Sequence, residues 1–480
     1  MNLEVQRTES TDLPLVVDLD DTLISTDLLV ESFFAWVGAN PLRVFSVPSL
    51  LAGGKARLKS VIARETPIDA TRLPYDERVL SLIREARANG RPVYLASASH
   101  ERYVRDVAGH LGLFDGWFAS TDIENLSSTA KAARLIGKFG EKQFDYVGNG
   151  KADLAVWRAA RGKHAVDPAP SVRAALKAID ADAVVLPARS GESRAWLKLL
   201  RIHQWAKNAL LFVPLFAAHL FDIASFGKVI LAATAFSLTA SSIYILNDLV
   251  DINADRAHRS KRLRPLAAGT VSIRRAMVVA PALLLVGVGI GLLVSLEFVA
   301  ALFAYLALTT AYTFYLKRKM MIDIVALASL YTLRVIAGAV AVASYPSVWI
   351  LAFSMFIFTA LSLIKRYVEL TGRLDAALPD PTNRNYRKTD LNVLGALAGA
   401  SGFNAVTVFA LYISSDTVHH LYRHPQALWL ICPILLYWVG RALIMAERRF
   451  MDDDPIVFAL KDRNSLLSFA LIGFIMIAAI

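Results

Sequence analysis

The chain has 480 residues, enough for two or more domains, and 55% of them are hydrophobic, which is high for a soluble protein. Its net charge of +11 is explained more simply by basic cytoplasmic loops of a membrane protein than by nucleic-acid binding. The single cysteine, Cys432, excludes a framework of disulfides or thiolate–metal bonds. The N-terminal stretch MNLEVQRTESTDLP lacks the apolar core of a signal peptide, so we expect the first domain to stay in the cytoplasm.

Residues 1–190 alternate apolar and polar runs in the manner of a globular α/β domain. The apolar run at 15–17 predicts a buried strand, and the sequence DLDDT follows it directly. Two carboxylates two residues apart, Asp18 and Asp20, suit phosphoryl transfer, because one attacks phosphorus while the other protonates the leaving oxygen. Both are expected at the carboxyl end of a parallel strand, where α/β sheets bind ligands.

Three further segments follow in order. A second strand ends in the hydroxyl of Ser97, and Lys131 lies in a helical pattern. The segment 144–153 then contains Asn149 and Asp153 after an apolar run. An amide oxygen can bind Mg²⁺ but brings no charge, so Asn149 is a weaker ligand than an aspartate at that position would be.

These four motifs, spread over residues 18–153, resemble those of the haloacid dehalogenase (HAD) phosphatases. The resemblance implies a Rossmannoid α/β domain with a helical cap in residues 28–90, and Mg²⁺ as cofactor. The implied roles are catalysis for Asp18, Asp20 and Lys131, substrate binding for Ser97, and metal binding for Asp18, Asp20, Asn149 and Asp153. The family usually has an aspartate where this chain has Asn149, so an inert regulatory HAD domain is the alternative.

The domain is expected to end near Ser190, and residues 191–207 are expected to form a linker and an interfacial helix. Residues 196–207 carry apolar, aromatic and basic side chains at helical spacing, which is typical of a helix lying on a membrane surface. We therefore predict three parts: residues 1–190, 191–207 and 208–480.

Repeated apolar runs near 20 residues in the last part predict nine transmembrane helices. The loops after the even-numbered spans are rich in lysine and arginine, so we expect them and the N-terminal domain on the cytoplasmic side. Because no signal sequence is recognised, we expect the membrane to be the inner one. The predicted spans are 208–224, 227–246, 276–294, 297–315, 321–343, 346–364, 391–413, 426–445 and 464–480.

An acidic stretch follows the second span. Asn247, Asp251 and Asp255 are spaced at i, i+4 and i+8, on one face of a helix, and Asp248 lies about 100° around it. Crowded carboxylates suit Mg²⁺, which proteins hold with a few carboxylates and substrate phosphates. Basic residues at 256–264 follow and suit anionic oxygens. The alternative interpretation is a solvated, positively charged loop.

This stretch resembles the first aspartate-rich motif, NDxxDxxxD, of the UbiA-type intramembrane prenyltransferases, and KRLRPLAAG at 261–269 resembles its continuation. The resemblance implies a nine-helix UbiA-type bundle that is all α. It also implies catalytic roles for Asp251 and Asp255, and metal binding by Asn247, Asp248, Asp251, Asp255 and Asp323.

The second half of the expected site lies in an apolar span. Asp323 and Arg334 fall inside it, where ionisable groups are costly and usually functional, and they are 11 residues apart, so they share a face. The alternative is a structural ion pair with other membrane residues. UbiA enzymes that act on aromatic acceptors commonly have a second aspartate here, but this chain has Leu327. The segment resembles instead the polyprenyl-phosphate phosphoribosyltransferases. That resemblance implies substrate binding by Lys261, Arg264, Lys317, Arg334, Lys365 and Tyr367.

We therefore predict a Mg²⁺-dependent intramembrane transferase that joins 5-phosphoribosyl diphosphate to a polyprenyl phosphate and releases diphosphate, followed by a phosphatase that removes phosphate from the product. The alternative is transfer from a prenyl diphosphate to an aromatic or other small acceptor, with an independent or inert HAD domain. The expected partners are the membrane, the polyprenyl phosphate lipid and the diphosphate donor, without nucleic acid. The oligomeric state is left open.

Overall fold

The computed structural model describes residues 13–186, 191–258, 260–381, 384–451 and 454–480, so the predicted boundary residue Ser190 lies outside the described residues. Contacts within the chain divide it into two units. The first consists of Met1–Leu200 with Tyr244–Ala280, and the second of Arg201–Ile243 with Pro281–Ile480. The first unit therefore contains both the expected phosphatase motifs and the aspartate-rich stretch.

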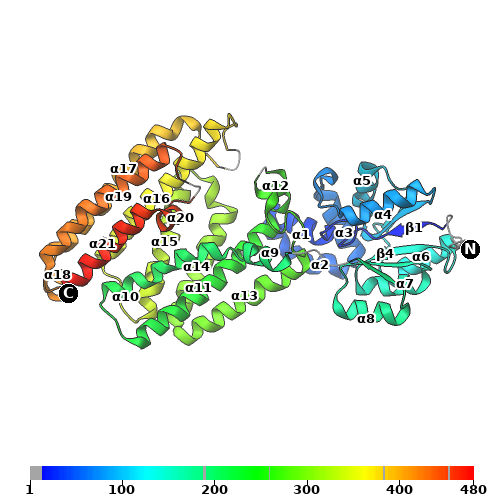
Figure 1. Ribbon diagram of the computed structural model, residues 1–480, viewed down its shortest axis with the longest axis horizontal. Helices are drawn as coiled ribbons and strands as arrows, with labels where there is room; N and C mark the ends of the chain where they lie inside the picture. Colours follow the sequence, from blue (N-terminus) through cyan, green and yellow to red (C-terminus); the bar gives the residue numbers. More distant parts are fainter. Residues whose placement is uncertain (1–12, 187–190, 259, 382–383, 452–453) are drawn as a thin grey trace, which may run out of the picture. The chain divides into compact units, whose positions relative to one another are not determined.

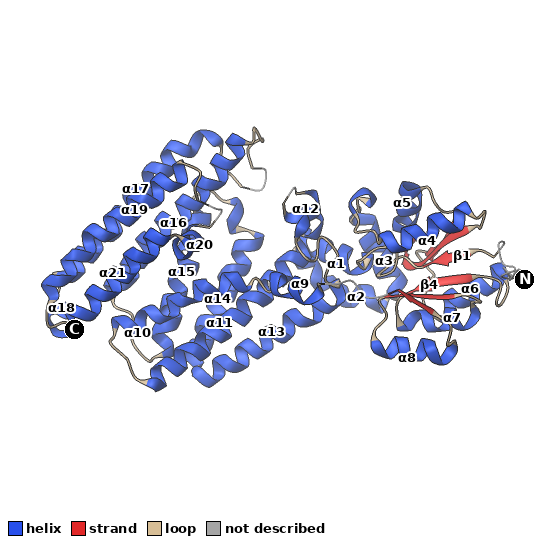
Figure 2. Cartoon of the chain, viewed as in Figure 1, coloured by secondary structure: helices blue, strands red, loops and turns tan. Residues whose placement is uncertain are grey.

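A six-stranded parallel sheet forms the centre of the first unit, and Figure 2 shows all strands of the chain within this N-terminal part. The strand order is β3-β2-β1-β4-β5-β6, so successive strands are added on one side of β1 up to β3 and on its other side from β4 onward. Ligands bind at such a switch point, beyond the carboxyl ends of the strands. The strands are β1 (Leu15–Val17), β2 (Val93–His100), β3 (Gly116–Ser120), β4 (Asp145–Gly148), β5 (Lys163–Val166) and β6 (Val184–Leu186).

Helices cover the sheet with apolar faces that follow the 3.6-residue period. Val79 and Ile83 of α4 belong to one buried cluster with β1 and β2, while Trp157 and Leu176 belong to another with β4 and β5. The helices of this unit are α1 (Leu28–Ala39), α2 (Val47–Ala52), α3 (Lys55–Glu65), α4 (Glu77–Ala88), α5 (Glu101–Leu111), α6 (Thr129–Phe139), α7 (Leu154–Ala159), α8 (Pro170–Ile179), α9 (Glu192–Leu199) and α12 (Ile252–Ala257). The stretch between the first two phosphatase motifs is mainly helical, as predicted.

The remainder of the chain is helical (Figure 1). Within the described residues, seven helices are long and apolar enough to cross a membrane, or eight if a pair of helices bent by 79° is one span. The predicted number of nine is therefore not confirmed. The helices are α10 (Val213–Ala217), α11 (Ile223–Val250), α13 (Ile273–Val294), α14 (Leu296–Phe314), α15 (Ile322–Ala341), α16 (Val348–Asp375), α17 (Leu391–Ile413), α18 (Asp416–Leu421), α19 (Ile431–Glu447) and the bent pair α20 (Pro455–Lys461) and α21 (Arg463–Ala479).

The ninth predicted span, 464–480, falls in the bent pair, and the first predicted span is not one long helix. Residues 208–224 contain the end of a 3₁₀ helix, Ile202–Phe212, and the short α10, after which His219 adopts a positive φ of 53°. Pro214 has no backbone N–H to continue a preceding helix, so it begins a new one here. The predicted interfacial helix at 196–207 is wrong as one element, because α9 ends at Leu199 and Arg201 adopts the left-handed conformation.

Candidate active sites

The first candidate site lies at the switch point of the sheet. Asp18 follows β1, and its Oδ1 accepts a hydrogen bond from Lys131 Nζ of α6 at 2.7 Å. Lys131 also donates to the Tyr146 hydroxyl at 3.0 Å and lies 3.6 Å from Asp153. The Tyr146 hydroxyl donates in turn to Asp153 at 2.7 Å. The structure thus joins three of the predicted residues through one buried ammonium, and Tyr146, which the sequence analysis missed, links two of them.

Asp20 is held by three donors. Its Oδ2 accepts from the hydroxyls of Ser97 at 2.8 Å and Ser99 at 2.7 Å, and its Oδ1 accepts from the backbone N–H of Leu28 at 2.8 Å. Ser97 was predicted to bind the substrate, which stays a prediction, and in this structure its hydroxyl donates to Asp20. Ser99 was missed, although its place two residues further along the same strand gives its side chain the same face as that of Ser97.

Burial dominates the electrostatics of this site. It raises the pKa of Asp18 to about 7, and the nearby Asp153 and Asp20 add to this increase while Lys131 opposes it. Burial also raises the pKa of Asp20. For Lys131, burial lowers the pKa, but the attraction of Asp18 and Asp153 outweighs it and leaves the pKa raised. Three carboxylates around one ammonium leave the site short of positive charge.

The metal motif adopts a capped turn after β4. One oxygen of Asp153 accepts the backbone N–H groups of Asn149 at 3.0 Å and Gly150 at 2.9 Å. No three His, Cys, Asp or Glu side chains of the described residues are grouped so that they alone hold a metal ion. Mg²⁺ commonly binds one or two carboxylates and takes its other ligands from water and substrate phosphate. The oxygen donors here fit that pattern, with substrate completing the set.

The second candidate site is the aspartate-rich stretch. The helix breaks after α11, but the N–H of Asp251 still donates to Asn247 O at 2.9 Å, and the N–H of Asp255 donates to Asp251 O at 2.8 Å. Helical i, i+4 backbone hydrogen bonds therefore continue across the break, in line with the predicted helical spacing of these residues. Asp248 and Asp255, both 3% exposed, converge on Arg264, at 3.2 and 2.7 Å from its Nη1.

This convergence makes an oxygen-rich cluster with one balancing cation. Burial raises the pKa of Asp255, and Arg264 opposes the rise. Arg264 was predicted to hold substrate phosphate, but in this structure it neutralises the acidic pair. Lys261, another predicted phosphate ligand, is half-buried in the short 3₁₀ helix Lys261–Leu263.

A third charged cluster lies in the second unit, at the start of α15 and the end of α16. Asp323, which is 0% exposed, accepts from Arg366 at 2.7 Å and from the Tyr386 hydroxyl at 2.6 Å. Arg366 also pairs with Glu369, and Arg384 lies 3.4 Å from Glu369. Both carboxylate oxygens of Asp323 therefore have protein partners, and metal binding by Asp323 stays a prediction.

Replacing Tyr386 with phenylalanine tests this cluster. The change removes a donor from a fully buried carboxylate and an acceptor from the Met321 N–H, which lies 2.9 Å from the hydroxyl. We expect the free energy of unfolding to fall by about 1–3 kcal/mol, the usual cost of a buried polar group left unsatisfied. Thermal unfolding in detergent measures the loss. The same change at Tyr315, which is 61% exposed, is the control, and equal losses would contradict the prediction.

Arg334 does not contact Asp323 in the structure. Its guanidinium donates to Asn208 at 3.1 Å, to the Leu330 carbonyl at 2.6 Å and to the Tyr305 hydroxyl at 3.1 Å. All three acceptors are neutral, so the buried charge keeps its attraction for an anion. This environment is compatible with the predicted phosphate contact.

Two other predicted substrate ligands, Lys365 and Tyr367, have protein partners, and a third, Lys317, is half-buried. Lys365 lies 3.6 Å from Asp454, which also pairs with Lys207. The hydroxyl of Tyr367 donates to Glu447. Lys317 is half-buried in the 3₁₀ helix Leu316–Arg318.

Comparison with known proteins identifies the helical part. The model of the UbiA prenyltransferase family matches residues 209–458. The chain is 37% identical to the uncharacterized protein y4nM of Sinorhizobium fredii over 467 residues, covering 96% of this chain and 90% of that protein. It is 36% identical to the decaprenyl-phosphate phosphoribosyltransferase of Mycobacterium tuberculosis over 179 residues, covering 36% of this chain and 59% of that enzyme.

For the N-terminal part, a HAD family hydrolase from Salmonella enterica matches with a TM-score of 0.28 and 16% identity, covering 35% of this chain and 66% of the hydrolase. The parallel strand order and the arrangement of Asp18, Asp20 and Lys131 are those expected of a HAD-like phosphatase domain. The chain belongs to the UbiA prenyltransferase family, as a multi-pass membrane enzyme with a parallel-sheet domain ahead of the family segment.

Proposed function

We propose that the chain is a Mg²⁺-dependent transferase that joins 5-phosphoribosyl diphosphate to a polyprenyl phosphate, releasing diphosphate, and that its HAD-like domain then removes the 5-phosphate from the product. Residues 1–190 form the phosphatase, 191–207 the linker and 208–480 the transferase. The protein lies in the inner membrane with the phosphatase in the cytoplasm, where the soluble donor is found.

The observation that carries the transferase proposal is the convergence of Asp248 and Asp255 on Arg264. Two buried carboxylates and a cation offer what a metal-bound diphosphate needs, oxygen ligands on one side and a positive group on the other. Asp251 lies one helical turn before Asp255, and Asn247 lies one turn before Asp251, linked by backbone hydrogen bonds. Bound there, Mg²⁺ would neutralise charge that develops on the diphosphate leaving group.

The choice of substrates rests on two further points. Position 327 is leucine, so the second aspartate common in enzymes for aromatic acceptors is missing. The relative from Mycobacterium tuberculosis bears the name decaprenyl-phosphate phosphoribosyltransferase, and its similarity supports a phosphorylated lipid acceptor. The buried guanidinium of Arg334, whose three hydrogen-bond acceptors within the described residues are neutral, supplies a charge for that phosphate.

The phosphatase step follows from the first site. An oxygen of Asp18 attacks phosphorus, the bond to the ribose C5 oxygen breaks, and Asp20 protonates that oxygen. Water then hydrolyses the aspartyl phosphate, releasing inorganic phosphate and restoring Asp18. Lys131, 2.7 Å from Asp18, neutralises the phosphoryl oxygens and holds the nucleophile in place.

A transfer assay tests the proposal. Purified full-length protein is incubated with labelled 5-phosphoribosyl diphosphate, a polyprenyl phosphate and Mg²⁺, beside Asp251→Asn. We expect the wild type to form a labelled lipid. The variant should form at least about tenfold less, because the acidic cluster loses a charged ligand. No labelled lipid should form after the metal is chelated, because the leaving diphosphate then lacks its neutralising charge. Asp222→Asn, an exposed aspartate at the start of α11, is the matched control and should leave transfer unchanged.

The phosphate content of the lipid tests the second step. Wild-type protein should yield a lipid with one phosphate fewer than the product of the Asp18→Asn variant. If no labelled lipid forms, and activity appears instead with a prenyl diphosphate and a small aromatic acceptor, the alternative transfer reaction replaces this proposal.

A further inference from the structure

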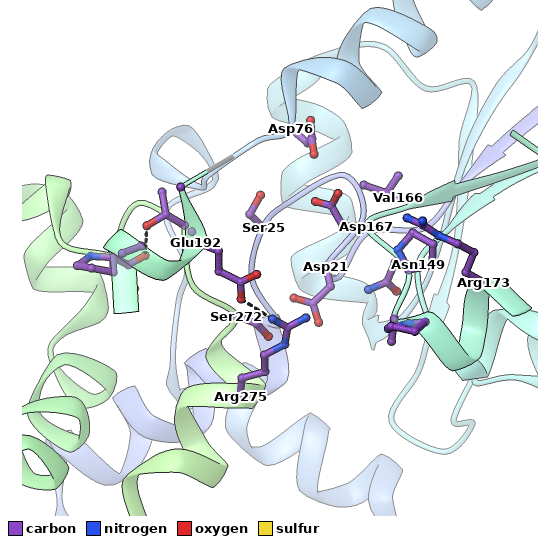
Figure 3. A pocket seen from close by; sticks show the side chains of 18 of the residues that line it. Asp21, Ser25, Asp76, Asn149, Val166, Asp167, Arg173, Glu192, Ser272 and Arg275 are labelled. Carbon is purple, nitrogen blue, oxygen red and sulfur yellow. Dashed lines mark hydrogen bonds and ion pairs between the residues drawn. The ribbon is translucent and has the colours of Figure 1, made fainter. Parts of the chain in front are cut away.

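A cavity of about 970 Å³ opens beside the phosphatase centre, within the first unit. Two of its lining residues belong to phosphatase motifs: Asp21 follows Asp20 directly, and Asn149 lies in the metal motif. In Figure 3, Asp21 lies between Asn149 and the pair formed by Glu192 and Arg275. Cavities of this size typically bind small organic ligands. The cavity therefore lies where the substrate of the phosphatase would extend away from the phosphate that is removed.

The acidic residues of the cavity wall already have arginine partners. Arg78 lies 2.6 Å from Asp76 and 3.0 Å from Asp167. Asp21 lies 3.4 Å from Arg274. Glu192 pairs with Arg275, an interaction drawn in Figure 3. The acidic groups are thus largely neutralised within the protein and do not repel an anionic ligand.

Four other cations line the cavity in two matched pairs. Arg173 and Lys177 are spaced i, i+4 on α8, and Arg194 and Lys198 are spaced i, i+4 on α9, so each pair shares one helix face. Within the described residues, none of the four forms an ion pair with a carboxylate, and Lys198 donates to the Leu263 carbonyl at 3.0 Å. Two helices therefore present uncompensated positive charge to the same cavity.

The remaining wall comes from the loop that follows the aspartate-rich stretch. Leu263, Thr270 and Ser272 line the cavity. Gly269 has a positive φ of 65°, and a Cβ at this position would lie 2.7 Å from Ser25 Cβ in the loop after the first phosphatase motif. The close approach requires glycine, so the loop is fitted closely against the phosphatase motif.

We propose that this cavity is the substrate pocket of the phosphatase, and that its four cations bind a second phosphate group of the substrate, a phosphodiester, while the terminal phosphate reaches Asp18. The substrate class is thus a sugar phosphate that also carries a phosphodiester, as the lipid product of the transferase does. This inference rests on the proposed function. It adds that a loop of the transferase sequence forms part of the phosphatase pocket.

The test compares two substrates of the full-length protein. One is ribose 5-phosphate, and the other is its soluble analogue with a short alkyl phosphodiester at C1. We expect the wild type to have at least about tenfold higher kcat/KM for the diester, because the added anion binds the cations. In the double variant Arg194→Gln/Lys198→Gln this preference should fall about tenfold. The pair Arg134→Gln/Lys138→Gln, exposed and i, i+4 on α6, is the matched control and should keep the preference.

A binding measurement keeps the inference testable if hydrolysis is slow. Titration calorimetry with the diester, using Asp18→Asn protein, should give a Kd that rises about tenfold when Arg194→Gln/Lys198→Gln is added. An unchanged preference and an unchanged Kd would overturn the pocket assignment. If the pocket prefers the diester but no labelled lipid forms in the transfer assay, the proposed transferase reaction fails while the pocket stands.

Discussion

Replacing Asp18 with asparagine should lower phosphate release by the full-length protein at least about a thousandfold, because the amide cannot form the aspartyl phosphate. The fold should not suffer. Burial already raises the pKa of Asp18 to about 7, which means that the charged carboxylate is costly at this position. Asparagine has the same shape without that cost. Lys131 still has a carboxylate nearby in the variant, because its Nζ lies 3.6 Å from Asp153. Two quantities are measured: release of the 5-phosphate from the ribose 5-phosphate analogue that carries the phosphodiester, and the thermal unfolding midpoint.

Asp106→Asn is the matched control, because Asp106 lies on the outer face of α5 with its side chain 45% exposed. It should change neither measurement. Asp18→Asn protein that releases phosphate at more than a tenth of the wild-type rate would show that Asp18 is not the nucleophile. Loss of activity together with a large drop in the unfolding midpoint would show instead that the residue is needed for the fold.

The first candidate site shows what a sequence can predict. Asp18 and Asp20 follow an apolar strand, and parallel strands place their carboxyl ends along one edge. Their proximity to residues in the second half of β2 and after β4 therefore follows from the pattern alone. Lys131 was assigned by resemblance, and the structure places it 2.7 Å from Asp18. The contribution of Tyr146 was not predictable, because a tyrosine in a buried strand gives no sign of which polar groups its hydroxyl will reach.

Contacts between distant parts of the chain were also beyond the sequence analysis. Arg264 looked like a phosphate ligand because it follows an acidic helix, but its partner depends on how the loop folds back, and it pairs with Asp255. Metal binding by Asp323 was implied by the resemblance to the UbiA enzymes, and it stays a prediction, but the protein partners of this carboxylate were not foreseen. Its partners Arg366 and Tyr386 lie 43 and 63 residues further along the chain, a separation at which periodicity carries no information.

The second large effect is expected from Arg256→Met, which breaks a buried ion pair. Arg256 of α12 lies 2.6 Å from Glu31 of α1, and their side chains are 5% and 0% exposed. Arg256 also donates to the Ala267 carbonyl at 3.0 Å. Removing Arg256 leaves Glu31 buried, with the Thr26 hydroxyl at 3.0 Å as its one side-chain donor within the described residues. Stability should therefore fall by about 3–5 kcal/mol. Pulse proteolysis over a urea series measures the loss.

Two comparisons distinguish the effect of leaving Glu31 buried without its partner from the effect of losing any arginine. Arg64→Met breaks an exposed pair with Asp122, 2.5 Å long with side chains 68% and 48% exposed, and should cost less than about 1 kcal/mol because solvent screens both charges. Adding Glu31→Met to Arg256→Met should restore much of the lost stability, since it removes the uncompensated carboxylate. If Arg256→Met costs no more than Arg64→Met, the pair does not anchor α12 to α1. If the double variant is as unstable as the single one, packing around Arg256 matters more than its charge.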